Sequence, residues 1–294
     1  MTTSGPDHDR RVDPHLGTLV HIVGGRQERP NLPSTGCPFC PGGIEAPEPY
    51  DVRWFPNRWP AMPGERCEVL LYTSDHDATF ASLGVDRAAA VVDLWARRTA
   101  TLGARDDVEY VLAFENRGPE VGATIAHPHG QLYAFDHVPE RQRAMLAAGW
   151  QPEADPGGRR VASSPGWTVS VPVASPFPIA LSVAPRTRIP DVVTLDAAQR
   201  RELAGVLVDT FARLDALFDR DLPYMMWLNQ RPTDGGEWPQ AWLHIEIVSP
   251  WRAAGVPRFI AAAEIATGEF FNPVVPEDLA RRLASITPVV GPEA

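Results

Sequence analysis

The chain has 294 residues, of which 44% are hydrophobic and 22% charged, so it can bury a sizeable core as one large domain or two joined units. Its formal net charge of −10 argues against general binding to a nucleic-acid backbone or an anionic membrane. All 27 basic residues are arginines, which excludes a lysine nucleophile, a Schiff-base enzyme and a lysine-dependent phosphate loop.

The cysteines are Cys37, Cys40 and Cys67, an odd and sparse set that does not form a disulfide framework. No apolar run is long enough to cross a membrane, and the polar segment Met1 to Arg11 lacks the apolar centre of a signal peptide. We therefore expect a soluble protein of the reducing cytoplasm, with a loose segment at its N-terminus.

The first half of the sequence predicts a loop, several strands and one helix in chain order. Residues 36–49 are rich in Gly and Pro and predict a loop. Strand signals follow at 51–57, 67–73, 108–116 and 125–135, the last bent by Pro128 and Gly130. A helix is expected at about 86–102, where apolar residues recur at helical spacing around a single hydroxyl, Thr99: Ala88, Val91, Val92, Trp95 and Leu102.

After a short helical stretch around 141–148 and a Pro/Gly/Ser-rich joint at 152–166, the order of elements repeats. Strands are expected at 167–174, 178–185, 224–230 and 242–249. A long helix is expected at about 196–219, with this apolar stripe: Leu203, Val206, Leu207, Phe211, Leu214 and Phe218.

Each half therefore reads as strand, strand, helix, strand, strand, and a duplicated unit is the economical interpretation. The first half ends in His127-x-His129 and the second in His244-x-Glu246 at the matching place. We expect an α+β fold of two halves, residues 1–150 and 151–294, in which antiparallel sheets with packed helices join into one continuous platform. One half would be active and the other eroded.

The segment HPHGQ, residues 127–131, carries the strongest chemical signal. On an extended strand, alternate residues share a face, so His127, His129 and Gln131 are expected to line one side. A single histidine is most often a satisfied core residue. Three polar groups on one face of a short and otherwise apolar strand indicate a functional site instead.

The chain resembles the galactose-1-phosphate uridylyltransferase family of the histidine-triad superfamily. The matching motifs occur in the family's order between about Asp13 and Leu283: GGRQERP (24–30), CPFC (37–40), FPNRWP (55–60), TSDH (73–76), FENRG (114–118) and GATIAHPHGQ (122–131). The resemblance implies a duplicated histidine-triad-like fold and the activity of a UDP-glucose–hexose-1-phosphate uridylyltransferase of galactose metabolism. Its substrates would be UDP-glucose or UDP-galactose and hexose 1-phosphates.

Histidine suits this chemistry because its unperturbed pKa of about 6.5 leaves a neutral nucleophile near pH 7. His129 is the expected nucleophile, forming a uridylyl-histidine in a ping-pong exchange, and a nearby backbone carbonyl is expected to hold its other ring nitrogen. Gln131 stands where hydrolytic relatives carry a histidine that protonates a poor leaving group. Glutamine donates no proton, so it favours transfer between phosphates over hydrolysis.

The resemblance implies a structural zinc ion held by Cys37, Cys40, His76 and His127, which is a full tetrahedral ligand set. Cys67 is expected in the core. Some family members hold a second metal in the second half, but the corresponding positions here are Met145, Asn229, His244 and Glu246. We therefore expect one zinc per chain and no second metal.

Substrate-binding residues also follow from the motif match, with Arg26 and Arg29 as candidates for bidentate bonds to phosphate. The others are Asn57, Asn116, Gly122, Ala123, Thr124 and Gln131 around the nucleotide, and Arg258, Phe259 and Glu264 in the stretch that matches the sugar-binding segment. Family members are dimers in which arginines of the Arg26/Arg29 type reach the partner's site, so a homodimer is implied.

Two alternatives remain open. One is an ADP-glucose or dinucleoside phosphorylase that uses the same histidine with phosphate as the acceptor. The other is a zinc-stabilised nucleotide-binding regulator without turnover, which the pairing of His129 with Gln131 disfavours.

Overall fold

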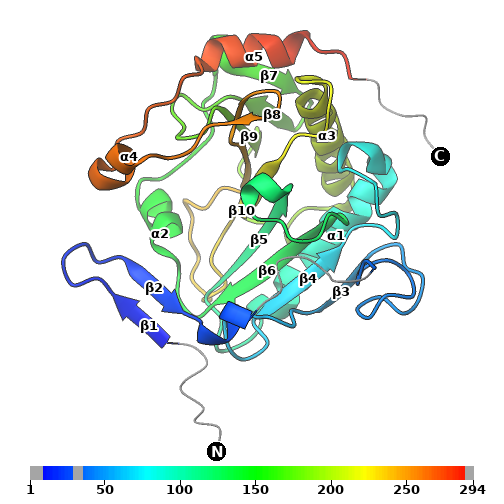
Figure 1. Ribbon diagram of the computed structural model, residues 1–294. Coiled ribbons are helices and arrows are strands. Elements are labelled where there is room, and N and C mark those ends of the chain that lie inside the picture. Colours follow the sequence, from blue (N-terminus) through cyan, green and yellow to red (C-terminus); the bar gives the residue numbers. More distant parts are fainter. Residues whose placement is uncertain (1–8, 29–35, 289–294) are drawn as a thin grey trace, which may run out of the picture.

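The computed structural model describes residues 9–28 and 36–288, and its centre is one antiparallel sheet of nine strands (Figure 1). The strand order is β3-β4-β6-β5-β10-β11-β9-β8-β7. The strands are β3 (Arg53–Pro56), β4 (Cys67–Leu71), β5 (Tyr110–Arg117), β6 (His129–Phe135), β7 (Arg160–Ser163), β8 (Trp167–Ser170), β9 (Ile179–Pro185), β10 (Tyr224–Asn229) and β11 (His244–Ser249). This confirms the expected α+β fold with a continuous platform.

Apart from the edge strand β7, the sheet is symmetric about the β5–β10 pair, as expected for a duplicated unit. One cross-strand row crosses the sheet through Phe55, Val69, Gln131, Phe114, Trp227, Glu246, Ser182 and Ser170. Gln131 and Glu246 are equidistant from the centre of that row, and His129 and His244 each begin their strand. The two halves therefore superimpose His129 on His244 and Gln131 on Glu246.

Two helices of 20 residues each, α1 (Gly84–Gly103) and α3 (Ala197–Ala216), lie side by side against one face of the sheet (Figure 1). The predicted stripe of α1 is buried, including Thr99. In α3 the stripe is buried or packs against the core, and Asp196 forms a capping box with Gln199 that starts the helix. The aromatic rings of Phe80, Trp95 and Phe211 pack together beneath the sheet.

The other face of the sheet carries loops and short elements. They are the hairpin of β1 (Asp9–Val12) and β2 (Leu19–Ile22), α2 (Glu140–Ala147) and α4 (Ala262–Thr267). The ribbon of β12 (Trp251–Ala253) and β13 (Val256–Pro257) contacts Phe218, just beyond α3. The helix α5 (Pro276–Ser285) packs near β7 at the sheet's edge, where Arg213 of α3 donates to the Leu283 carbonyl. In Figure 1 the hairpin, α2 and α4 lie across the sheet from α1 and α3. No helix in the described ranges is both long and apolar enough to cross a membrane.

Several sequence-based boundaries were wrong. Residues 9–11 are not loose, because they pair with β2 in the hairpin. The segment 125–135 becomes a strand only at His129, and the joint at 152–166 contains β7, which pairs with β8 at the sheet's edge. The strand expected at 167–174 ends at Ser170. These limits depend on backbone pairing with a distant strand, which the local composition does not indicate.

Candidate active site and metal centre

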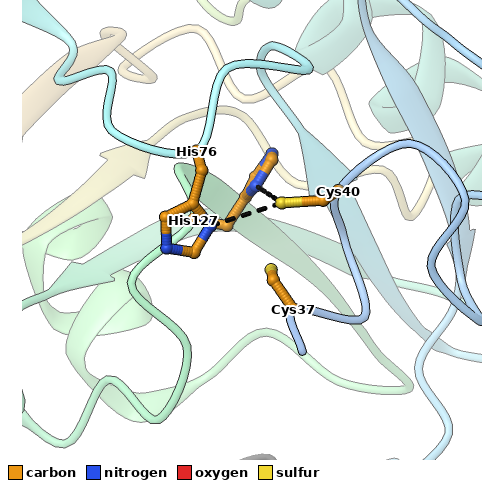
Figure 2. A group of neighbouring side chains, drawn as sticks. All are labelled: Cys37, Cys40, His76 and His127. Carbon is orange, nitrogen blue, oxygen red and sulfur yellow. Dashed lines mark hydrogen bonds between the residues drawn. The ribbon is translucent and has the colours of Figure 1, made fainter. Parts of the chain in front are cut away.

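Four side chains from three distant segments form a compact Cys/His cluster (Figure 2). Cys37 and Cys40 come from the loop before β3, His76 follows β4, and His127 precedes β6. Their ligand atoms all lie within 4.8 Å of one another. The Cys40 Sγ is 3.4 Å from the Nδ1 of His76 and 3.6 Å from that of His127. The structure therefore brings together all four residues predicted as metal ligands, in a set that fits a tetrahedral metal.

The hydrogen bonds of His127 select the tautomer that a metal needs. Its Nε2 lies 2.8 Å from the carbonyl oxygen of Thr73, which can only accept, so Nε2 carries the proton and Nδ1 offers a lone pair toward Cys40. The Tyr50 hydroxyl lies 2.8 Å from the same nitrogen and donates to the Phe39 carbonyl at 2.6 Å. Sequence analysis missed Tyr50 and Thr73 because neither belongs to the ligand pattern.

Burial favours the neutral forms of Cys40 and His127. Burial, reinforced by the neighbouring Cys37 thiol, raises the pKa of Cys40 to about 11. Burial lowers the pKa of His127, which keeps its imidazole neutral. A divalent cation reverses the balance at the thiols because it stabilises both thiolates directly.

His129 begins β6 directly after the cluster. Its Nδ1 donates a hydrogen bond of 2.8 Å to the carbonyl oxygen of His127, so Nε2 carries the lone pair. The expected backbone carbonyl partner is thus the carbonyl of one of the predicted metal ligands. The ring also packs edge-on against Phe39, with centroids 5.1 Å apart. His127 itself lies before the strand and points into the cluster, so it does not share the working face of His129 and Gln131 as predicted.

A cavity of about 170 Å³ opens beside His129. Of the predicted residues, Asn57, Thr124, His129 and Gln131 line it. The remaining wall is largely aromatic and aliphatic, and none of its side chains was predicted as a site residue, although four of them belong to the matching motifs: Phe39, Ile44, Phe55, Trp59, Val69 and Ile125. An apolar cleft with a few convergent polar groups is typical of a small-molecule site.

On the polar side of the cavity, two amide side chains are hydrogen-bonded to each other. The Asn57 Nδ2 donates to the Gln131 Oε1 at 3.2 Å, and the Asn57 Oδ1 accepts from the Trp59 backbone nitrogen at 2.9 Å. Since the Gln131 oxygen accepts from Asn57, its NH₂ group is the end available to donate to a ligand oxygen. At the mouth, Arg58 pairs with Glu45 at 2.9 Å.

The Gly122–Thr124 turn reaches the same cavity through Thr124. Gly122 has a φ of +81°, in the left-handed region that favours glycine, and the Ala123 nitrogen donates to the Gly118 carbonyl at 3.2 Å. Asn116 is two residues beyond Phe114 on β5, on the same face of the sheet as Gln131, but it does not line the cavity.

Four further predicted binding residues, Arg26, Arg258, Phe259 and Glu264, do not line this cavity. Arg26 donates to the Tyr133 hydroxyl at 3.3 Å, and Arg29 lies outside the described residues. Arg258 forms a buried ion pair with Glu264 and donates to the Pro176 carbonyl at 2.8 Å, so these two side chains brace the α4 segment. Phe259, beside them in sequence, is 79% exposed.

His244, which occupies the equivalent position in the second half, has different neighbours. The His244 Nδ1 donates to the Trp242 carbonyl at 3.0 Å, as His129 does to His127, but Trp150 stacks on the His244 ring with centroids 3.4 Å apart. Glu246 accepts two bonds from Arg141, at 2.8 and 2.9 Å, and one of 2.8 Å from Asn229. Met145 lines the adjoining cavity, which measures about 470 Å³.

Comparisons with known proteins agree with this geometry. The family model for the N-terminal domain of galactose-1-phosphate uridyl transferase matches residues 59–139, and that for the C-terminal domain matches residues 129–290. The galactose-1-phosphate uridylyltransferase of Thermotoga maritima is 33% identical over 93% of this chain and 96% of its own. That of Streptomyces lividans is 34% identical, covering 95% of this chain and 87% of its own.

Solved structures show the same architecture. A uridylyltransferase structure superimposes with a TM-score of 0.84 at 26% identity, covering 94% of this chain and 97% of its own. An ADP-glucose phosphorylase from Arabidopsis thaliana shares the fold, with a TM-score of 0.78 at 20% identity, covering 95% of this chain and 99% of its own.

The duplicated α+β architecture, which the solved uridylyltransferase shares, places the chain in the histidine-triad class of proteins. Within that class, the chain belongs to the galactose-1-phosphate uridyl transferase family.

Proposed function

We propose that this chain exchanges a uridylyl group between UDP-glucose and hexose 1-phosphates, with galactose 1-phosphate as the acceptor, through a covalent intermediate on His129. The observation that carries the proposal is the bond from His129 Nδ1 to the His127 carbonyl beside the cavity. It leaves Nε2 as the nucleophilic nitrogen and orients the ring. A cavity shared with Gln131, Asn57 and Thr124 supplies polar groups for a phosphate.

In the first half-reaction, the lone pair of His129 Nε2 attacks the α-phosphorus of UDP-glucose. The bond from that phosphorus to the bridging oxygen breaks, and glucose 1-phosphate leaves with the electron pair. The resulting uridylyl-imidazole is cationic because Nδ1 keeps its proton. The His127 carbonyl oxygen, 2.8 Å from Nδ1, stabilises that charge.

In the second half-reaction, a phosphate oxygen of galactose 1-phosphate attacks the same phosphorus. The N–P bond breaks, its electron pair returns to Nε2, and UDP-galactose forms. Neither step requires a proton donor, because each leaving group is already stable as it departs. The Gln131 amide donates a hydrogen bond to a phosphoryl oxygen, which suits transfer and supplies no acid for hydrolysis.

The Cys37, Cys40, His76 and His127 cluster fits zinc by its donor set of two thiols and two imidazoles. Bound zinc contributes folding energy there and takes no part in the chemical steps. It holds His127, whose carbonyl orients the nucleophile. We propose one zinc per chain and no metal at His244 and Glu246.

We expect the enzyme to work as a homodimer. Arg26, Arg29 and the exposed Phe259 would reach the site of a second copy, while Arg258 and Glu264 brace the segment that carries Phe259. Within each subunit, residues 1–150 form the half with the nucleophile and residues 151–294 the half with this segment. We place the enzyme in the cytoplasm because its cysteines act as reduced ligands.

The test is mass spectrometry of the intact protein after incubation with UDP-glucose. A mass increase of one uridylyl group, removed by galactose 1-phosphate and mapped to His129 by peptide sequencing, is the expected result. A parallel incubation with ADP-glucose and inorganic phosphate distinguishes the phosphorylase alternative. An adenylyl adduct in place of the uridylyl adduct would overturn the proposal, and so would the absence of any adduct.

A further inference from the structure

A polar side chain contacts the strand that carries His129, on the face opposite the cavity. Gly130 separates His129 from Gln131, and its missing side chain would point away from the cavity, toward the helices. A Cβ placed on Gly130 would lie 2.0 Å from the Tyr72 hydroxyl oxygen and 3.1 Å from the Phe114 carbonyl oxygen. The Tyr72 hydroxyl therefore occupies the space behind Gly130, in contact with the strand backbone.

Tyr72 is fixed from several directions. It is 1% exposed and directly follows β4, where its backbone nitrogen donates to the Pro128 carbonyl at 3.3 Å. Its hydroxyl oxygen accepts a bond of 3.3 Å from Trp95 Nε1 on α1. A tyrosine held at both ends cannot move away from Gly130 without breaking one of these bonds.

Glu115 completes the network from the neighbouring strand. It follows Phe114, the residue paired with Gln131, and so lies beside Gly130 on the helix-facing side of β5. Its Oε1 accepts a 2.6 Å bond from the Tyr224 hydroxyl, whereas Oε2 has no bond of ordinary geometry. Burial raises the pKa of Glu115 to about 7, and the hydroxyls of Tyr224 and Tyr72 oppose that rise.

The second half shows that the fold does not require these polar groups. The symmetry of the sheet places Ile245 where Gly130 stands, Leu228 where Glu115 stands and Pro185 where Tyr72 stands. Val208 takes the place of Trp95 at the same position within the 20-residue helix α3. All four are buried and apolar. A buried carboxyl costs stability that an apolar core avoids, so the first half retains it for another reason.

We infer that Tyr72 and Glu115 are positioning residues for the nucleophile: they hold the backbone at Gly130, and through it the directions of the His129 and Gln131 side chains. The inference rests on the proposed role of His129. Successive strand residues point to opposite faces, so a rotation of the peptide planes around Gly130 turns both flanking side chains together. A displacement of about 1 Å at a reacting group can cost about 10²-fold in rate.

Tyr72→Phe and Glu115→Gln test this role with little change in volume. The measurement is the single-turnover rate of uridylyl-enzyme formation with UDP-glucose, together with kcat, KM, zinc content and thermal stability. We expect each variant to lower the adduct-forming rate and kcat by about 10- to 100-fold, with KM changed by less than about threefold. Adduct rates within about twofold of the wild type in both variants would overturn the inference.

Gly130→Ala tests the contact itself. It should lower the rate at least as much as Tyr72→Phe, and Gly130→Ala combined with Tyr72→Phe should regain about tenfold. Recovery is expected because the 2.0 Å clash disappears and the nearest ring carbon would be 2.9 Å away, which a small shift relieves. A double variant slower than both single variants would contradict the contact as the cause.

Leu228→Ala in the second half is the matched control for general damage to the core. It should lower thermal stability by creating a cavity, yet leave the adduct-forming rate within about twofold of the wild type. An equal fall in rate in this control would make loss of stability the explanation and overturn positioning. If the wild type forms no uridylyl adduct, the proposed function fails, whereas an adduct that the variants form at the normal rate refutes only this inference.

Discussion

The two halves of this chain place a histidine at the same point of the same sheet and surround it differently. His129 and His244 each begin a strand, and each donates Nδ1 to the carbonyl two residues before. A cavity with amide and hydroxyl groups lies beside His129. Trp150 covers His244, which is only 3% exposed. The position of a histidine in the fold therefore does not fix its accessibility, because the segments that cover the sheet decide whether the ring faces a cavity.

The polar groups around the two histidines differ in the same way. In the second half, Glu246 is satisfied within the chain by Arg141 and Asn229. In the first half, the loop that contains Cys37 and Cys40 brings ligands to His127 and leaves the face of His129 toward a cavity. The polar groups of the second half thus bond to one another, whereas those of the first half line a cavity.

The largest expected effect comes from removing each histidine in turn. His129→Ala should lower exchange by about 10⁴-fold or more, because no other group can form the covalent intermediate. His244→Ala should leave exchange within about threefold of the wild type. Steady-state exchange between UDP-glucose and galactose 1-phosphate measures both. Comparable losses in the two variants would refute the assignment of one active half.

A companion variant distinguishes lost chemistry from a damaged site. His129→Gly should transfer a uridylyl group to galactose 1-phosphate when uridine 5′-phosphoimidazolide is supplied, since the reagent brings its own imidazole. Failure of this rescue, with the variant folded and zinc-loaded, would count against His129 as the nucleophile.

Metal content is the second contrast between the halves. Elemental analysis of dialysed protein should give one zinc per chain by ligand count. Cys40→Ser should lose that zinc and lower exchange by about 10- to 100-fold, because the segment that holds the His127 carbonyl loosens. Glu246→Ala is the matched control in the second half and should leave the zinc content unchanged. Two tightly held metals per chain would disprove the expected asymmetry.

A smaller effect concerns Gln131 and Glu246, which occupy equivalent positions in the two halves. Gln131→His should raise the ratio of UMP release to UDP-galactose formation by about tenfold, because histidine restores a group that can assist attack by water. Chromatography of nucleotide products after a fixed incubation gives the ratio. Glu246→His serves as the control and should not change it. A constant ratio in the Gln131 variant would contradict the role assigned to the amide.

The smallest effect is confined to acid and to stability. Burial lowers the pKa of His244 to about 4, below its ordinary value of 6.5. The folded state therefore binds this proton less readily than the unfolded state, and stability is lost as the pH falls from 6.5 toward 4. The full loss is on the order of 3 kcal/mol. Denaturant unfolding of the wild type and of His244→Ala should differ in slope across this window, and parallel curves would refute the prediction.

Sequence alone determined the parts of this protein that depend on local pattern and residue chemistry. The apolar spacing around Trp95 and Phe211 predicted α1 and α3, since helix periodicity is set by neighbours a few residues away. HPHGQ singled out His129 and Gln131 by residue type and alternation along a strand, and both line the cavity. The repeated order of elements also predicted a duplicated unit, because each half supplies its own strands and its own helix.

Tertiary structure alone decided which distant groups meet and which are covered. No spacing rule brings Tyr50 to His127, Trp150 onto His244 or Arg258 to Glu264, because these contacts depend on how loops pack over a finished sheet. The aromatic wall of the cavity has the same origin. Tyr72 looks like an ordinary core residue in sequence, and only the close approach of its hydroxyl to Gly130 distinguishes it. Local pattern selects the elements, but the contacts that shape the site arise from long-range packing between them.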